Sequence, residues 1–212
     1  MRTRPTHTVA LVVAAALGAI VAAPSLSVAG TSTTVPTTAP TLGAGGPEGP
    51  FCSSIPPEGE GSFVGMADDP VATAASNNPY LTTLTAAVQA AGLVDTLNAE
   101  GPFTVFAPNN EAFAAVPPAD LDAVLADIPY LTDILTHHVV IGQRLRADEL
   151  VEAGKVVTAS GAALTFTREA DGSVSINGGA AHITCAYVPT INAMVQIIDR
   201  VIIPPPALAP IR

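Results

Sequence analysis

The stretch TVFAPNNEAF, residues 104–113, contains the change of periodicity that decides the fold. Residues 103–107 are rich in β-branched and aromatic side chains and are followed by Pro108, which predicts a short strand that ends there. Either Asn109 or Asn110 can then cap a helix through its side-chain oxygen. The stretch therefore predicts a strand that turns directly into a short helix.

Helical periodicity lies on both sides of this stretch. In residues 80–92 apolar side chains recur at helical spacing, and Gly92 is a natural stop. A second helix is expected after Pro117-Pro118 and should end before Pro129. Residues 128–136 predict a third.

The second half of the chain favours strands. Residues 164–167 and 173–176 alternate apolar with polar side chains, and Asp171-Gly172 between them is a hairpin signal. Residues 195–203 form a further β-rich stretch that ends in prolines. Because helices come first and strands later, we expect an α+β domain with helices packed on a mainly antiparallel sheet.

Two further segments complete a family pattern. LTHHVVIG occupies residues 135–142, and QIIDRVIIPP occupies residues 196–205. Together with TVFAPNNEAF and in this order, they resemble the fasciclin domain over about residues 63–205. The resemblance implies a single domain whose N-terminal helices pack on a sheet, or β-wedge. Residues 69–98 and the two flanking cysteines are also similar to the secreted immunogenic fasciclin proteins of mycobacteria.

The resemblance implies structural or interaction roles for nine residues: Thr104, Phe106, Pro108, Asn109, Asn110, Phe113, His137, His138 and Asp199. The chain departs from the family at Asn109, where Thr is usual, and at Gln196, where His is frequent. His137 replaces a usual Tyr, which weakens transfer of the Tyr-His adhesion role of animal fasciclin domains. Adjacent side chains on a strand face opposite ways, so His137 and His138 should not share a ligand. We expect His138 to be partly buried and hydrogen-bonded between helix and sheet.

Residues 1–29 predict a secretory signal peptide. Basic Arg2 and Arg4 precede an apolar run at residues 9–23, which is shorter than the roughly 20 residues of a membrane span. Small residues at 27–29 favour cleavage after Ala29, with Ala23 as the alternative. With no Cys at that cut and no C-terminal anchor signal, we expect a secreted, extracellular protein that is released or held loosely at the cell envelope.

Composition divides the rest of the chain into three parts. Residues 30–61 are rich in Thr, Pro and Gly, which predicts a disordered segment that is either a spacer or a passive leader and can carry sugars on its hydroxyls. Residues 62–206 suit one fasciclin domain with one core. Residues 207–212 form a tail.

The charge balance excludes a nucleic-acid partner. The chain has a formal net charge of −10, and loss of the signal leaves six basic residues against 18 acidic ones, a charge near −12. Binding a phosphate backbone needs clustered Lys and Arg, whereas this chain has one lysine, Lys155, and no basic run.

Two cysteines, Cys52 and Cys185, are present in a chain predicted to enter an oxidising compartment. One disulfide is the favoured interpretation. Metal ligation or a catalytic thiol are the alternatives, but neither cysteine has a nearby Cys partner of the kind that metal sites use.

Catalytic motifs are missing from the sequence. It has no Gly-x-Ser-x-Gly elbow, phosphate loop, Cys-x-x-Cys or His-Glu-x-x-His. Its carboxylates fall between apolar helix positions, where charges are normally solvated: Asp120, Asp122, Asp127, Asp133, Asp148, Glu149 and Glu152. We therefore expect no catalytic, cofactor-binding or metal-binding residue, and a protein that is not an enzyme.

The function expected from these features is adhesion or protein interaction outside the cytoplasm. The partner would be a cell-surface or extracellular protein or polysaccharide, and the protein would be a monomer with no membrane span after cleavage. Its contact surface is expected to be a patch of exposed apolar side chains, together with backbone near the turn at residues 109–114. The alternative is an extracytoplasmic carrier that holds a small apolar ligand, a lipid or porphyrin, between helices and sheet.

Overall fold

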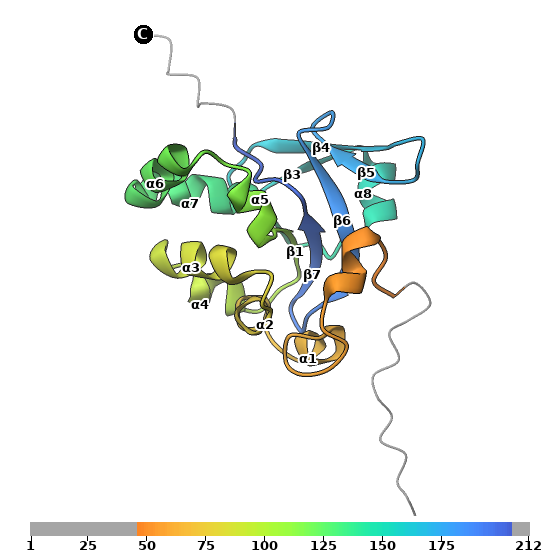
Figure 1. The fold of residues 1–212 in the computed structure, drawn as a ribbon. Coiled ribbons are helices and arrows are strands. Elements are labelled where there is room, and N and C mark those ends of the chain that lie inside the picture. Colours follow the sequence, from red (N-terminus) through yellow and green to blue (C-terminus); the bar gives the residue numbers. More distant parts are fainter. Residues whose placement is uncertain (1–45, 205–212) are drawn as a thin grey trace, which may run out of the picture. The chain divides into compact units, whose positions relative to one another are not determined.

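The structure is a computed structural model that describes residues 46–204 (Figure 1). The predicted signal peptide at residues 1–29 and the tail at 207–212 lie outside the described residues. The elements, in chain order, are η1 (Pro50–Ser54), α1 (Phe63–Ala67), α2 (Val71–Asn77), α3 (Thr82–Ala90), α4 (Val94–Asn98), β1 (Phe103–Pro108), α5 (Asn110–Ala114), α6 (Pro118–Ala126), α7 (Ile128–His137), β2 (Val139–Ile141), α8 (Ala147–Ala153), β3 (Lys155–Val157), β4 (Ala163–Arg168), β5 (Val174–Ile176), β6 (Ala181–Pro189) and β7 (Ala193–Ile198).

The strands of this region form one seven-stranded sheet in the order β2-β1-β7-β6-β5-β4-β3. All neighbouring pairs are antiparallel except β1 and β7, which run parallel with Phe103 opposite Ala193. The two ends of the strand order meet, because the backbone N–H of Ala159 donates to the carbonyl of Val139 at 2.7 Å. The sheet therefore curls into a barrel-like wedge, and the expected α+β class is confirmed.

β1 and β7 lie at the centre of the fold because both of their faces are buried. Along β1, Phe103, Val105 and Ala107 pack beneath the helices α2–α5 and α7, whereas Phe106 packs on the opposite face. β7 alternates in the same way, with Ile197 on the helical side and Ile198 on the other. Burial on both faces is typical of parallel strands. The result is two hydrophobic cores, with α8 covering the second (Figure 1).

Most elements expected from periodicity are present. The three predicted helices appear as α3, α6 and α7, and the predicted strand after residue 102 appears as β1. The Asp171-Gly172 hairpin joins β4 to β5, with Phe166 opposite Ile176. These elements are confirmed because each carries its own apolar period and its own stop signal.

Two details of the sequence prediction are wrong. His137 and His138 are not on a strand, since His137 ends α7 and His138 is its C-cap. The apolar stripe of α7 continues through His138, whose ring bonds to the carbonyl of Ile134 one turn earlier. The closing strand ends at Ile198 rather than at residue 203, because the N–H of Ile202 bonds to the His138 ring and not to a strand.

The predicted disordered segment at residues 30–61 is too long, since residues 46–61 belong to the fold. The N–H of Glu48 bonds to the carbonyl of Ala186 at 3.1 Å, and the N–H of Ala186 returns a bond of 2.7 Å to Glu48. Cys52 forms a disulfide with Cys185 of β6, which confirms the expected pairing. Ile55 is buried in the first core. A Pro- and Gly-rich composition concealed this packing because the disulfide and the Glu48–Ala186 hydrogen bonds that attach the segment both come from β6, far along the chain.

We predict that replacing both cysteines with alanine lowers the free energy of unfolding by about 2–5 kcal/mol, because the disulfide closes a long loop whose entropy the unfolded chain otherwise regains. Guanidinium unfolding of the secreted form measures the change, with wild-type protein in reductant as the control. An unchanged midpoint in the variant would contradict a stabilising role for this link.

Candidate interaction site

The turn after β1 is held by two adjacent asparagines that cap two different helices. The side-chain oxygen of Asn109 accepts a hydrogen bond of 2.8 Å from the N–H of Ala112, as an N-cap of α5. The Oδ1 of Asn110 accepts from the N–H of Thr83 at 3.0 Å in the first turn of α3, and its Nδ2 donates to the carbonyl of Pro79. Asn109 can stand in place of the family's threonine because both side chains offer a capping oxygen.

Four other motif residues are buried parts of the frame. The hydroxyl of Thr104 donates to the carbonyl of Gln143 and accepts from the N–H of Leu145, which fixes the loop before α8. Phe106 and Pro108 are fully buried, and Phe113 lies in the first core. No partner can contact these side chains without unfolding the domain.

His138 joins α7 to the chain after β7. Its Nδ1 bonds to the carbonyl of Ile134 at 2.8 Å, and its Nε2 accepts from the N–H of Ile202 at 3.0 Å. A carbonyl can only accept, so Nδ1 carries the proton and the ring is neutral. Burial lowers the pKa of His138 to about 4. Both ring nitrogens are occupied, which leaves none for a ligand.

His137 is also buried, and it contacts a different part of the fold. Its Nδ1 lies 3.2 Å from the hydroxyl of Thr158 and 3.1 Å from that of Ser160, both after β3. Its Nε2 is buried without a hydrogen-bond partner among the described residues. Burial lowers the pKa of this ring as well. Because the two histidines contact different elements, the structure does not bring them into one site.

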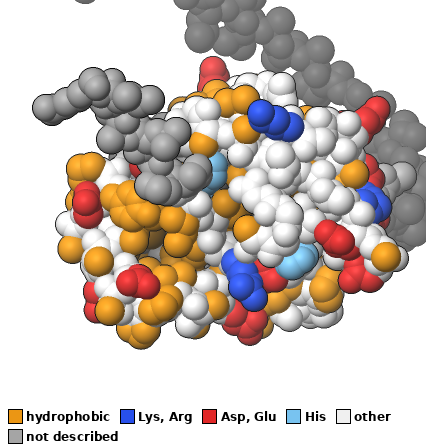
Figure 2. Space-filling view, turned by 90° about the horizontal axis from the view of Figure 1, so that it is seen from above, with side chains coloured by type: hydrophobic (Ala, Val, Ile, Leu, Met, Phe, Trp, Pro, Cys, Tyr) orange, Lys and Arg blue, Asp and Glu red, His pale blue; other side chains and the backbone are white. Residues whose placement is uncertain are grey.

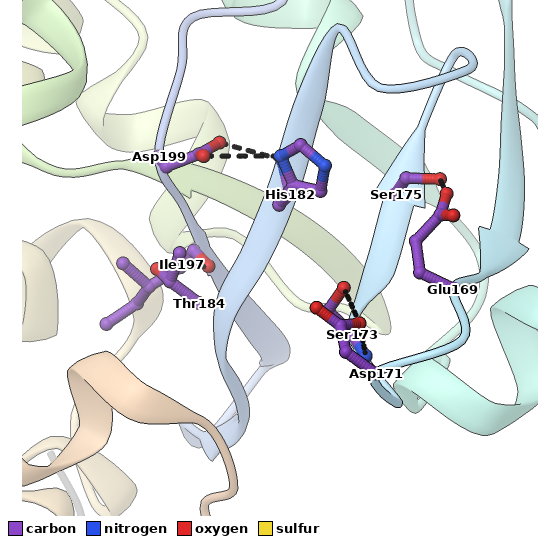
Figure 3. Close-up of polar contacts among 8 residues, drawn as sticks. All are labelled: Glu169, Asp171, Ser173, Ser175, His182, Thr184, Ile197 and Asp199. Atoms are coloured by element: carbon purple, nitrogen blue, oxygen red, sulfur yellow. Dashed lines mark hydrogen bonds and ion pairs between the residues drawn. The ribbon is translucent and has the colours of Figure 1, made fainter.

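Asp199 pairs with His182 at the end of β7 (Figure 3). One carboxylate oxygen accepts from the backbone N–H of His182 at 2.7 Å, and the other lies 3.3 Å from its Nδ1. Ser175 is opposite His182 on β5, but its hydroxyl bonds to Glu169 at 2.5 Å. Figure 3 shows the two pairs directed away from each other. The three residue types of a hydrolase triad are present on adjacent strands without the hydrogen-bonded order that such chemistry requires.

Gln196, the third departure from the family pattern, hydrogen-bonds to the backbone at a bulge in β6. Its Oε1 accepts from the N–H of Tyr187 at 3.3 Å, and its Nε2 donates to the carbonyl of Leu145 at 3.0 Å. Tyr187 has a φ of 64°, within a shift of the β6–β7 register. The glutamine therefore satisfies a backbone N–H that the bulge removes from the ladder.

The carboxylates expected at the surface are all exposed, from Asp120 on α6 to Glu152 on α8. Among residues 46–204, no three His, Cys, Asp or Glu side chains come together in a way that could hold a metal ion. None of the helices in that range has the length and apolar character that crossing a bilayer requires.

An open groove of about 630 Å³ lies beside the capped turn. We call it the α5–α7 groove. Its apolar lining comes from α5, the loop between α5 and α6, α6, α7, the turn before β6 and the chain after β7: Ala112, Ala115, Val116, Pro117, Ala123, Val124, Tyr130, Ala180, Val201 and Ile203. Asp120, Asp127 and Arg200 add charges. Figure 2 shows apolar side chains gathered on the side where α6 and α7 lie in Figure 1. Ala112, within the turn at residues 109–114, is one of the lining residues.

Sequence reasoning did not find the groove residues themselves. α6 has no fully buried residue, so its apolar side chains are left partly exposed. Val201 and Ile203 reach the groove only because the chain leaves β7 early. The one available signal lay in residues 118–126. Acidic and apolar residues are interspersed there, so the helix has no separate apolar face that could be fully buried.

The fold and this distribution of buried motif residues define a fasciclin domain. A family model for the fasciclin domain matches residues 79–204, and the chain belongs to that family. Among solved structures, it is similar to a FAS1 domain pair from the insect cell adhesion molecule fasciclin I, with a TM-score of 0.56 and 18% identity. That similarity covers 66% of this chain and 52% of the other, so the chain spans about half the length of the pair.

Bacterial relatives are closer in sequence. The chain is 42% identical to the immunogenic protein MPB70 of Mycobacterium bovis, over 87% of this chain and 96% of the relative. It is 46% identical to the cell surface glycolipoprotein MPB83 of the same species, over 70% of this chain and 67% of that protein. These relatives confirm the expected subgroup and the location: the protein is secreted and works outside the cytoplasm.

We predict that Asn110→Ala lowers the free energy of unfolding by about 1–2 kcal/mol, because α3 loses its capping acceptor and α5 loses a link to Pro79. The matched change Asn110→Asp keeps the acceptor for Thr83 and should cost less. Urea unfolding of the three proteins measures the order. Equal stability of the alanine variant and the wild type would contradict a capping role.

We also predict that the free energy of unfolding decreases as the pH is lowered, because of His138. The unfolded ring binds a proton below about pH 6.5, whereas the folded ring does so only near pH 4. The contribution of His138 to the free energy of unfolding is therefore complete above about pH 6.5, and about 3 kcal/mol of it is lost as the pH falls to 4. His138→Gln should flatten this part of the profile of unfolding free energy against pH. Parallel profiles for the two proteins would contradict the assignment.

Proposed function

We propose that the protein is a non-enzymatic adhesion or protein-interaction domain that binds an extracellular partner through the α5–α7 groove. The observation that carries this proposal is the contrast between the buried motif residues and the exposed apolar lining beside them. Exposed apolar surface with charged neighbours is typical of protein interaction sites. The similarity to an insect adhesion molecule supports the same class of function.

The chemistry of the groove favours a particular kind of partner. Tyr130 and Ile203 have exposed fractions of 39% and 54%, and they offer apolar contact at its edge. Asp120 and Asp127 give it acidic charge, in a chain that is acidic overall. A protein surface with apolar and basic side chains complements this lining better than a polysaccharide, which presents mainly hydroxyl groups.

The polar contacts support a role without catalysis. His138 uses both ring nitrogens for the backbone, Ser175 is buried against Glu169, and His182 faces Asp199. A nucleophile and a base within hydrogen-bond reach of each other are the minimum for acyl-transfer chemistry. In Figure 3 the hydroxyl of Ser175 and the ring of His182 are paired with different carboxylates, Glu169 and Asp199. This arrangement favours a binding protein over an enzyme.

We predict that Ile203→Glu weakens binding to the partner at least tenfold, because the new carboxylate replaces an apolar contact and loses its hydration when the partner's apolar side chains cover it. The assay measures retention of the purified secreted protein on envelopes of its own host and on immobilised extracellular matrix proteins, across a concentration series.

The matched control is Ile191→Glu. Ile191 is 61% exposed and precedes β7, whereas Ile203 follows it, so the two isoleucines flank opposite ends of the same strand. The control should bind like the wild type. Equal loss in both variants, or loss in neither, would remove the groove from the proposal; failure of the wild type to bind either surface would contradict the adhesion function.

A further inference from the structure

A second hollow lies inside the fold, between the helices α2–α4 and the strands β1 and β7. Its volume is about 220 Å³, and no residue that lines it also lines the α5–α7 groove. Val88 of α3, Leu97 of α4 and Val105 of β1 are among its apolar walls. We call it the α2–α4 cavity. An engineered apolar cavity of about 150 Å³ is large enough to bind benzene, so this one can hold a larger hydrocarbon group.

The walls of the cavity carry no charge. None of its lining residues is Asp, Glu, Lys or Arg. His138 is the one titratable residue among them, and burial holds its pKa near 4, so the ring is neutral at physiological pH. Both of its nitrogens already bond to the backbone. An ionised group placed here would lose its hydration without gaining a partner, which is strongly unfavourable.

Uncharged polar side chains mark where the cavity meets solvent. Ser76 of α2, Gln89 of α3 and Thr96 of α4 line it and are themselves exposed. Hydroxyl and amide groups at an opening can hydrogen-bond a polar but neutral head group, while the apolar walls enclose the rest of the ligand. A carboxylate or phosphate head would find no cation here, in a chain with a net charge of −10.

We propose that the α2–α4 cavity is a binding site for a single alkyl chain with an uncharged hydroxyl head group, such as a fatty alcohol or a monoacylglycerol. The volume lies below the roughly 300–1,000 Å³ of pockets that enclose drug-sized ligands, so a porphyrin does not fit. The site is independent of the α5–α7 groove.

The first test is calorimetric titration of the secreted protein, freed of bound lipid by extraction, with hexanol, octanol and decanol. We expect saturable binding of one molecule, with affinity rising about fourfold per added methylene until the cavity is full. At pH 7.5 decanoate should bind at least tenfold more weakly than decanol. No saturable binding, or decanoate binding as tightly as decanol, would overturn the proposal.

The second test places the ligand. Val88→Phe introduces a ring into the cavity, so it should weaken decanol binding at least tenfold while the unfolding temperature stays level or rises. Val156→Phe is the matched control: Val156 is as buried as Val88 (8% and 7% exposed) but packs in the second core, where the same ring should lower the unfolding temperature. Ala75→Leu, at a half-buried lining position on α2, repeats the test if Val88→Phe fails to fold.

The less disruptive Val156→Ala completes the set. It should reduce thermal stability yet keep decanol affinity within twofold of the wild type, which separates loss of the site from loss of stability. Decanol binding that survives both Val88→Phe and Ala75→Leu would locate the ligand elsewhere and overturn the proposal. Retention on cell envelopes should be unchanged in these variants, so the outcome is distinct from that of the adhesion test.

Discussion

The parallel pairing of β1 with β7 is the constraint on which the rest of the structure depends. It joins Phe103–Pro108 to Ala193–Ile198, segments about ninety residues apart, through six consecutive register positions. Both strands are buried on both faces, so each must carry apolar residues on its two faces. The helices then cover one face, and the remaining strands with α8 enclose the other. One long-range pairing thus creates two cores at once.

The family motifs serve this arrangement. Asn109 caps α5, which follows β1, and Asn110 caps α3, which precedes it. His138 binds the backbone where the chain leaves β7, and Asp199 continues the β6–β7 contact beyond the last ladder bond. Each of these side chains satisfies a backbone group that the irregular geometry would otherwise leave unpaired. Their conformations are therefore fixed by the fold, and the recognition that we propose uses the less constrained surface around α6.

The same packing explains why the molecule has two apolar hollows of different character. The α5–α7 groove is open because α6 lies at the margin of the fold with no fully buried residue. The α2–α4 cavity is largely enclosed because the short helices α2, α3 and α4 cover β1 and β7. Small side chains leave the space between these layers, among them Ala72 and Ala74 on α2 and Ala107 on β1. An acidic, open groove suits a protein surface, and a neutral, enclosed cavity suits a hydrocarbon chain.

The sequence by itself determined the local elements, the α+β class and the family, because apolar periods, proline stops and the segment at residues 104–113 act over a few residues. It also indicated the disulfide, from two cysteines in an exported chain. Only the tertiary structure decided that His137 and His138 end a helix, that residues 46–61 belong to the fold, and where the groove and cavity lie. These features depend on contacts between segments far apart in the chain, and local periodicity contains no information about which distant backbone groups will meet.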